Sequence, residues 1–239
     1  MRAFRWIVGL AVYAVCVAAG APAGGVPDTI EQRVAACTSC HGAQGRGLRD
    51  GASAPRIAGQ PAAYLALQLR YFQSGQRKDD TMRYITKPLT PDYAKEIAGY
   101  FASQTMAVDA GRPSPSAGEL AQRGAQIVLK GDPSRGVPPC ASCHGSRLAG
   151  REPLIPGLAD LSSNYLKSQF AQWRSHARAA DRPYCMSVVA NRMSEAEIDA
   201  AVQWLADRRP GDVPSTDAVG GREPPLPEWC VMDEAGAGL

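Results

Sequence analysis

Two short stretches decide the fold, Cys37-Thr38-Ser39-Cys40-His41 and Cys140-Ala141-Ser142-Cys143-His144. Both have the pattern Cys-x-x-Cys-His, which is typical of sites where a c-type haem is attached to a protein. The spacing suits this chemistry because two thiols add to two vinyl groups on one edge of the porphyrin, while the adjacent imidazole lies beneath the iron. We therefore predict two covalently bound haem c groups. The attachment residues are Cys37, Cys40, Cys140 and Cys143, and the axial histidines are His41 and His144.

Two other uses of paired cysteines fit the pattern less well. A thioredoxin-like redox pair needs one Cys-x-x-Cys at the start of a helix in a strand-rich domain, and strand patterns are scarce here. A zinc site could use both pairs, but it would not require a histidine directly after each pair. The chain contains only three histidines, which excludes functions that need many imidazoles.

The N-terminus has the pattern of an export signal. Arg2 and Arg5 precede an uncharged, mostly apolar run over residues 6–19, and a segment of small residues follows. We predict a signal peptide over residues 1–23. An uncleaved membrane anchor is the alternative, but the run is shorter than the ~20 residues that a spanning helix needs. The mature protein is expected in the periplasm, free or associated with the membrane, without stable insertion into it.

The two halves of the chain repeat each other at an offset of 101 to 104 residues. Such an internal repeat predicts two homologous domains. The matching pairs include Pro55-Arg56-Ile57-Ala58 with Pro156-Gly157-Leu158-Ala159, Tyr64-Leu65 with Tyr165-Leu166, Gln68 with Gln169, and Arg77 with Arg178. The predicted units are an N-terminal domain at 26–110, a linker at 111–116, a C-terminal domain at 117–210 and a Pro-rich acidic tail at 211–239.

Each repeat is expected to be all-helical. Apolar residues recur at spacings of three and four in the central part of each half, which predicts a helix there. The expected helices cover 28–36 and 61–74 in the first half, and 117–129 and 162–175 in the second. A last helix in each half begins after Thr90 or Ser194, the second of these in a capping box. The predicted fold class is all-α.

The order of these motifs in each half resembles the dihaem cytochromes c4. The resemblance covers about residues 28–209 and includes both haem motifs, both Pro-x-[Ile/Leu]-Ala segments and both Tyr-Leu-x-x-Gln segments. It implies two tandem class I cytochrome c domains, packed with their haems near each other and serving periplasmic electron transfer. Related dihaem subunits of flavocytochromes and dehydrogenases share this architecture, so the resemblance indicates the fold more firmly than the redox partner.

The sixth ligand of each iron is predicted to be a methionine. Methionine is the usual ligand in class I carriers because it stabilises ferrous iron and raises the reduction potential. Met82 lies seven residues before Leu89, and Met186 lies seven residues before Met193, which aligns with Leu89. Met82 and Met186 are therefore equivalent and are the predicted ligands of the first and second iron.

The second iron has two alternative ligands, His176 and Cys185. Cys185 and Cys230 are the cysteines left over in the exported chain, and an oxidising compartment favours their pairing as a disulfide. Such a bond would tie the tail back over the second haem domain. A thiolate of Cys185 on the iron would instead lower the potential sharply, as in some dihaem enzymes that oxidise sulfur compounds. The spacing of the residues leaves both possibilities open.

Two prolines follow the haem motifs at nearly equal distances. The resemblance implies that the carbonyl groups of Pro55 and Pro156 accept a hydrogen bond from the axial histidine, which orients the ring. Prolines that only stiffen a loop are the alternative. The repeated arginines and glutamines are candidates for contacts with haem edges or propionates, although exposed polar residues of a helix would have the same sequence pattern.

Charge indicates the kind of partner. Residues 24–210 contain 23 basic and 17 acidic side chains, whereas residues 211–239 contain one basic and six acidic side chains. The basic body suits weak, salt-sensitive docking of an acidic redox protein. A nucleic-acid-binding role is not expected, because it would leave two covalent haems without a purpose.

The predicted function is the transfer of single electrons between redox partners, with a membrane respiratory complex or oxidase among them. No general base, nucleophile or phosphate-binding loop stands out beside the haem motifs, as expected of an electron carrier. The alternative is a dihaem oxidoreductase, or the haem subunit of a dehydrogenase, that acts on a sulfur compound such as thiosulfate. An enzyme of this kind would need an unusual or labile ligand at the second iron.

Overall fold

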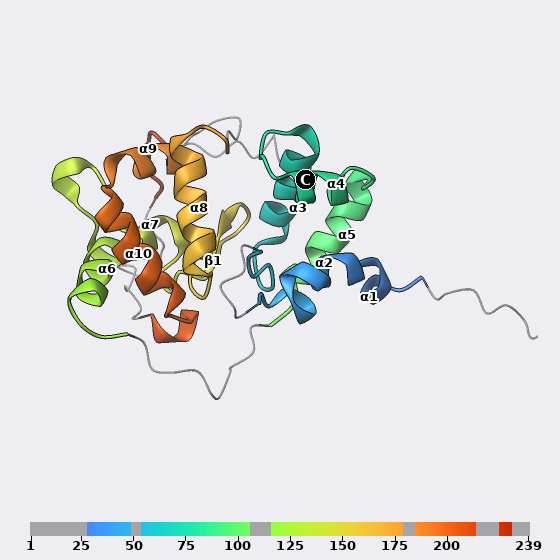
Figure 1. Cartoon of the computed structure of the whole chain (residues 1–239), viewed down its shortest axis with the longest axis horizontal. Helices are drawn as coiled ribbons and strands as arrows, with labels where there is room; N and C mark the ends of the chain where they lie inside the picture. The colour runs from blue at the N-terminus through green and yellow to red at the C-terminus, as the bar shows by residue number, and fades with distance from the viewer. Residues whose placement is uncertain (1–27, 49–53, 106–115, 179–184, 214–224, 231–239) are drawn as a thin grey trace, which may run out of the picture.

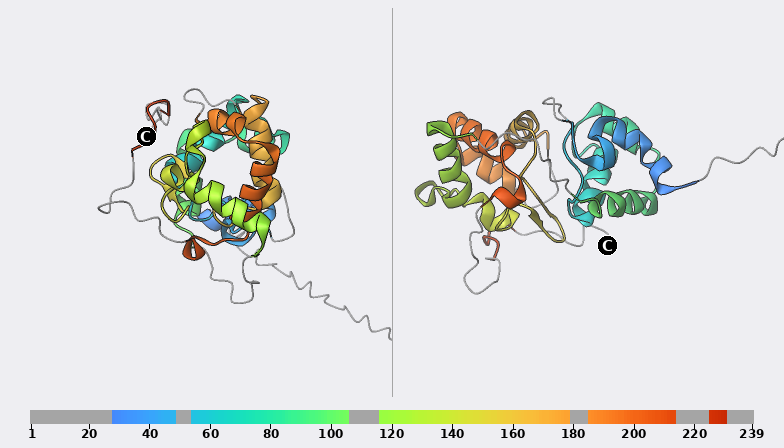
Figure 2. Two further views of the ribbon diagram at one scale, coloured as in Figure 1. Left: turned by 90° about the vertical axis from the view of Figure 1, so that its left-hand side faces the viewer. Right: turned by 90° about the horizontal axis from the view of Figure 1, so that it is seen from below.

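The computed structural model describes residues 28–48, 54–105, 116–178, 185–213 and 225–230. Figure 1 shows two helical halves side by side along the long axis of the molecule, and the views in Figure 2 agree. The predicted signal peptide lies outside the described residues, as do all but the last residue of the predicted linker and most of the acidic tail. In the described part of the chain, no helix is both long enough and apolar enough to cross a membrane.

The first half is built from short helices around a small core. Its elements are α1 (Ile30–Arg33), α2 (Ala35–His41), the 3₁₀ turn η1 (Ala43–Gly45), α3 (Ala62–Ser74), α4 (Asp80–Thr86) and α5 (Pro91–Ala102). Thr90 caps α5 through its hydroxyl, and Pro91 occupies the first helical position, where a missing N–H costs nothing. The buried core residues are Val34, Leu65, Ala66, Ile97, Ala98 and Phe101.

The second half repeats this arrangement with a larger core. Its elements are α6 (Glu119–Lys130), η2 (Pro133–Arg135), α7 (Cys140–His144), α8 (Ser163–Arg174), α9 (Cys185–Arg192), α10 (Glu195–Ala206) and η3 (Pro210–Asp212). Helices α6 and α10 cross closely at Gly124. A Cβ atom at this position would lie 2.3 Å from the carbonyl oxygen of Ala200 and 2.6 Å from the Cβ of Trp204. Only glycine allows this approach without a shift of one helix.

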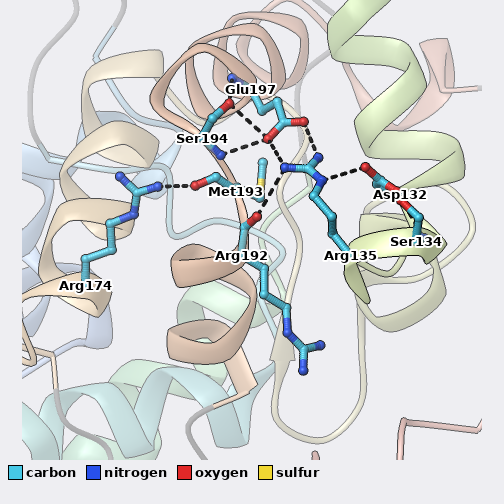
Figure 3. Close-up of polar contacts among 8 residues, drawn as sticks. All are labelled: Asp132, Ser134, Arg135, Arg174, Arg192, Met193, Ser194 and Glu197. Carbon is cyan, nitrogen blue, oxygen red and sulfur yellow. Dashed lines mark hydrogen bonds and ion pairs between the residues drawn. The ribbon is translucent and has the colours of Figure 1, made fainter.

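A polar network fastens the loop after α6 to the junction between α9 and α10 (Figure 3). Arg135 donates to Asp132 at 2.6 Å and to Glu197 at 3.0 Å. Glu197 also accepts from the backbone N–H of Ser194 at 2.8 Å, while the Ser194 hydroxyl caps α10. This is the capping box that the sequence predicts, and Arg135 extends it across the domain.

The helices differ from the sequence-based expectation in two ways. The predicted helix at 28–36 is two helices, because Val34 ends α1 and turns the chain while its own side chain is buried. Helices α4 and α9, which carry the two methionines, were not predicted. They are seven and eight residues long, too short for an apolar repeat to establish itself.

A small hairpin interrupts the all-α pattern in the second half. Strand β1 (Gly150–Arg151) pairs antiparallel with β2 (Ile155–Pro156). Leu154, at the tip of this hairpin, is buried against Ala63 and Leu67 of α3. Figure 1 shows the hairpin reaching toward the first half. The hairpin therefore belongs to the contact between the halves and leaves the helical fold class unchanged.

Candidate haem sites

Each haem motif lies on a short helix that presents its reactive side chains together. The first motif forms the last turn of α2, and the second forms all of α7. Residues three and four apart on a helix lie on the same face, so both cysteines and the following histidine of each motif point in a similar direction. His41 and His144, the predicted axial histidines, are both buried.

One cavity of about 900 Å³ is lined by residues of both halves. This volume is near the top of the usual range for ligand pockets, about 300–1,000 Å³. Its lining includes every predicted attachment and axial residue, namely Cys37, Cys40, His41, Met82, Cys140, Cys143, His144 and Met186. The structure therefore brings together around one cavity the residues that sequence reasoning assigned to two haems.

The two predicted axial histidines contact the prolines that the family resemblance indicated. The Nδ1 atom of His41 lies 2.8 Å from the carbonyl oxygen of Pro55, and that of His144 lies 2.7 Å from the carbonyl oxygen of Pro156. A carbonyl oxygen only accepts, so each Nδ1 carries the proton and donates it. The other ring nitrogen is then unprotonated and free to bind iron.

The surroundings keep both rings neutral. Burial lowers the pKa of His144 to about 4, and the nearby guanidinium of Arg178 acts in the same direction. Burial also lowers the pKa of His41. Because a protonated imidazole has no lone pair for a metal, these shifts favour the form that binds iron.

The first cysteine of each motif lacks the lowered pKa of a reactive thiol. Burial raises the pKa of the Cys140 thiol to about 12 and also raises the pKa of the Cys37 thiol. Reactive cysteines need the opposite shift. Among the described residues, no group of three or more His, Cys, Asp or Glu side chains gathers as a metal site. The described residues therefore give no support to the thioredoxin-like and zinc alternatives.

An N-cap at the start of α4 and a hydrogen bond from its last residue hold Met82 in place. The Asp79 carboxylate accepts from the backbone N–H of Met82 at 2.8 Å, and the Thr86 hydroxyl donates to the Met82 carbonyl at 2.8 Å. Met186 is the second residue of α9. Its side chain is half-buried against the core of the second half. Both methionines are thus placed at the cavity wall by the start of a short helix.

The alternative ligands of the second iron are differently placed. Cys185 and Cys230 form a disulfide, with their Cα atoms 5.0 Å apart. A sulfur in a disulfide has no thiolate to offer to a metal. His176 lies at a separate shallow hollow beside Ser187 and Asn191 and does not line the haem cavity. In this structure Met186 is the best placed of the three candidates.

Two buried arginines exchange hydrogen bonds across the boundary between the halves. Each donates to the glutamine of its own half and to the tyrosine and glutamine of the other half. Arg77 donates to Gln68 at 2.8 Å, Tyr165 at 3.0 Å and Gln169 at 2.8 Å. Arg178 donates to Gln169 at 2.8 Å, Tyr64 at 3.0 Å and Gln68 at 3.1 Å. Their own backbones also pair as an isolated antiparallel bridge.

These arginines leave buried positive charge at the cavity. Among the described residues, the hydrogen-bond acceptors of Arg77 and Arg178 are neutral amide and phenol oxygens. Burial and the charge of Arg77 lower the pKa of Arg178, but an arginine in a protein remains protonated. Arg56 also lines the cavity, and its buried Nε has no hydrogen-bond partner. Buried charges require opposite charges.

A haem in each half fits this donor set. The two propionate carboxylates of a haem would be ionic partners for the buried arginines, whose hydrogen-bond acceptors among the described residues are neutral. The Cys-x-x-Cys-His turns would hold the macrocycle and one face of the iron. When bound, each haem supplies a reversible one-electron couple. The chain supplies the ligands, the low dielectric and the orientation.

Sequence reasoning did not identify the interface residues Arg56 and Gln60. Arg56 donates to the carbonyl oxygen of Ala159 at 3.0 Å, and Gln60 exchanges two hydrogen bonds with the backbone of Gly157. Both side chains are buried. The available signal was their position, Arg56 inside the repeated proline segment and Gln60 just after it, directly before an apolar helix.

A comparison with models of protein families gives no match. Individual proteins are more informative. The chain is 33% identical over 190 residues to cytochrome c4 of Thiocapsa roseopersicina, across 78% of this chain and 95% of that one. The chain belongs to the dihaem cytochrome c4 family. Like the cytochromes c4, it carries two covalently bound haem c groups, folds as tandem class I cytochrome c domains and serves electron transfer.

Solved structures agree with this membership of the cytochrome c4 family. The crystal structure of reduced recombinant cytochrome c4 from Pseudomonas stutzeri matches with a TM-score of 0.66 and 27% identity, over 75% of this chain and 96% of that one. Two other similar proteins have names that include thiosulfate dehydrogenase. A protein of Thiomonas intermedia described as a thiosulfate dehydrogenase electron acceptor is 38% identical, over 72% of this chain and 78% of that one. Thiosulfate dehydrogenase from Marichromatium purpuratum matches with a TM-score of 0.64 and 32% identity, over 72% of this chain and 36% of that one.

Proposed function

We propose that this protein is a periplasmic electron carrier that accepts electrons from a thiosulfate dehydrogenase and passes them to a membrane respiratory complex or oxidase. Its first iron is ligated by His41 and Met82, and its second by His144 and Met186. The observation that carries the carrier function is the equivalence of the two sites, since each combines a proline-oriented histidine with a methionine at the start of a short helix. The dehydrogenase as electron donor rests on the similarity to the thiosulfate dehydrogenase electron acceptor of Thiomonas intermedia.

Export and domain organisation complete the proposal. The predicted signal peptide at 1–23 would deliver the chain to a compartment where disulfides form. The proposed domains at 26–110 and 117–210 each contain one haem motif, one cap-started last helix and one methionine helix. The Cys185–Cys230 disulfide supports an oxidising location.

The carrier function is favoured over the enzyme alternative by the state of Cys185. A haem that oxidises thiosulfate itself would need an open or labile position at its iron. The structure offers a methionine at each site and holds the Cys185 sulfur in a disulfide.

The test is to mix the oxidised holoprotein with thiosulfate, with and without a purified thiosulfate dehydrogenase, and to follow haem absorbance in a stopped-flow instrument. The proposal predicts no reduction by thiosulfate alone and rapid reduction of both haems when the dehydrogenase is present. Sustained thiosulfate oxidation by the protein alone, with an artificial acceptor, would establish the enzyme alternative. Absence of reduction under both conditions would exclude the dehydrogenase as electron donor.

A further inference from the structure

Residues 225–230 of the C-terminal tail lie against the second haem site. Leu226, Trp229 and Cys230 line the same cavity as the haem residues, although they follow the end of α10 by about twenty residues or more. Cys230 is buried, whereas Trp229 is 39% exposed. We call residues 225–230 the tail clamp.

The tail clamp is bonded covalently to the first residue of the helix that bears Met186. Cys230 forms the disulfide with Cys185, which begins α9, and Met186 is the next residue. The start of α9 cannot move away from the cavity without carrying the clamp with it. The first turn of α9 and the tail clamp must therefore move together.

The other end of α9 is held by the same segment. The guanidinium of Arg192, the last residue of α9, lies 5.5 Å from the centre of the Trp229 ring, which is a cation–π contact. Arg192 also donates to the carbonyl oxygen of Gly136 at 2.6 Å. The tail clamp therefore contacts α9 at both its ends.

The equivalent helix of the first half has no such attachment in the described part of the chain. Helix α4 is fixed by its own cap, Asp79, and its Tyr84 side chain is 81% exposed. The two halves otherwise repeat each other in their motifs, prolines and methionines. The tail clamp is thus an asymmetry added to one of two equivalent sites.

We infer that the tail clamp is a positioning device for Met186, which keeps the methionine at the second iron and closes that site to small exogenous ligands. The inference rests on the proposed ligation by Met186. A covalent tie reduces the conformational freedom of the segment that it closes, so α9 is expected to open less often than α4. Without the tie, opening of α9 would expose the second iron while the first stays as before.

The test uses a variant with Cys185→Ser and Cys230→Ser, purified with both haems attached. Carbon monoxide is titrated into the ferrous protein, and the methionine–iron charge-transfer band of the oxidised protein is recorded. We expect the variant to bind one equivalent of carbon monoxide per chain at least about tenfold more tightly than the native protein. This change corresponds to a decrease of about 1.4 kcal/mol in the free energy needed to open α9. The charge-transfer band should lose up to half of its intensity.

Two further variants separate a positioning effect from general destabilisation. Trp229→Ala keeps the disulfide but removes the contact with Arg192, and it should give a smaller increase in carbon monoxide affinity at the same single haem. Tyr84→Ala, on the exposed surface of α4, is the matched control and should leave carbon monoxide binding unchanged. If the double serine variant fails to fold, the Trp229→Ala variant carries the test.

The outcomes are distinct. Carbon monoxide affinity equal to native in both clamp variants would overturn the inference. Binding at both haems would also overturn it, because the effect would then be global. Met186→Ala tests the underlying ligand assignment separately. If that variant keeps the full charge-transfer band, the proposed ligation fails, whatever the clamp variants do.

Discussion

Replacement of Arg77 by methionine removes one of the buried charges at the boundary between the halves while keeping an apolar stem of similar length. Three hydrogen bonds are lost, to Gln68, Tyr165 and Gln169. Gln68 and Gln169 each keep a donor from Arg178, at 3.1 and 2.8 Å. In the described structure, the loss therefore falls most heavily on the Tyr165 hydroxyl.

The size of the effect follows from this arrangement. Loss of a hydrogen bond to a charged group costs about 1.5–3 kcal/mol. Because both glutamines keep a donor from Arg178 and the repulsion between the two guanidiniums is relieved, the cost of Arg77→Met is close to that of one such bond at the upper end, about 3 kcal/mol. Each kcal/mol shifts the melting temperature of a protein of this size by about 2–4 °C. The expected decrease is about 6–12 °C.

Thermal unfolding of the oxidised holoprotein, followed by haem absorbance and circular dichroism, measures this decrease. Arg178→Met should lower the melting temperature by a similar amount, because its contacts mirror those of Arg77. The melting temperature of Arg77→Lys should lie between those of the native protein and Arg77→Met, since lysine keeps the charge but lacks the planar guanidinium group. Arg83→Met, at an exposed position of α4, is the control. A decrease below about 2 °C for Arg77→Met, as for a surface substitution, would refute the reasoning.

Three further outcomes follow from individual positions. Gly124→Ala should destabilise the protein by about 1–3 kcal/mol in denaturant unfolding, because the added Cβ would overlap α10. Gly99→Ala is the control and should be neutral or stabilising, because there is open space around Gly99. Equal effects of the two substitutions would contradict the close crossing of α6 and α10. The Arg135 side chain, together with Ser194, lowers the pKa of Glu197 from 4.5 to about 2. The contribution of the ionised Glu197 carboxylate to the stability of the fold is therefore present above pH 4.5 and is lost as the pH falls toward 2. Melting temperatures of Glu197→Gln should therefore depend less on pH across this window, and an unchanged pH profile would contradict the network. Met82→Ala should let the first haem bind carbon monoxide in the ferrous state, and an unchanged spectrum would remove Met82 as ligand.

The haem residues could be proposed from sequence because their chemistry imposes a fixed local spacing. The Cys-x-x-Cys-His pattern places three groups on one helical turn, and the internal repeat pairs Met82 with Met186 without reference to any structure. Helices α3 and α8 were likewise predictable, because their long apolar repeats span several turns.

The interface could not be predicted, because its polar residues are buried only when the two halves pack together. Arg77 and Gln68 have the sequence pattern of exposed helix residues, yet both are buried by contacts with the other half. The burial of Leu154 could not be predicted either, because it lies on a short hairpin and is buried only where that hairpin packs on α3 of the other half. Helix α9 also depends on a distant residue, Cys230, which lies 45 positions away.

Near-infrared magnetic circular dichroism of the oxidised holoprotein, combined with a coulometric count of electrons per chain, tests the central claim most directly. The account predicts two low-spin irons, both with histidine and methionine ligands, and uptake of two electrons per chain. A thiolate, bis-histidine or water-ligated signature at either iron, or uptake of one electron, would contradict the proposed pair of equivalent carrier sites.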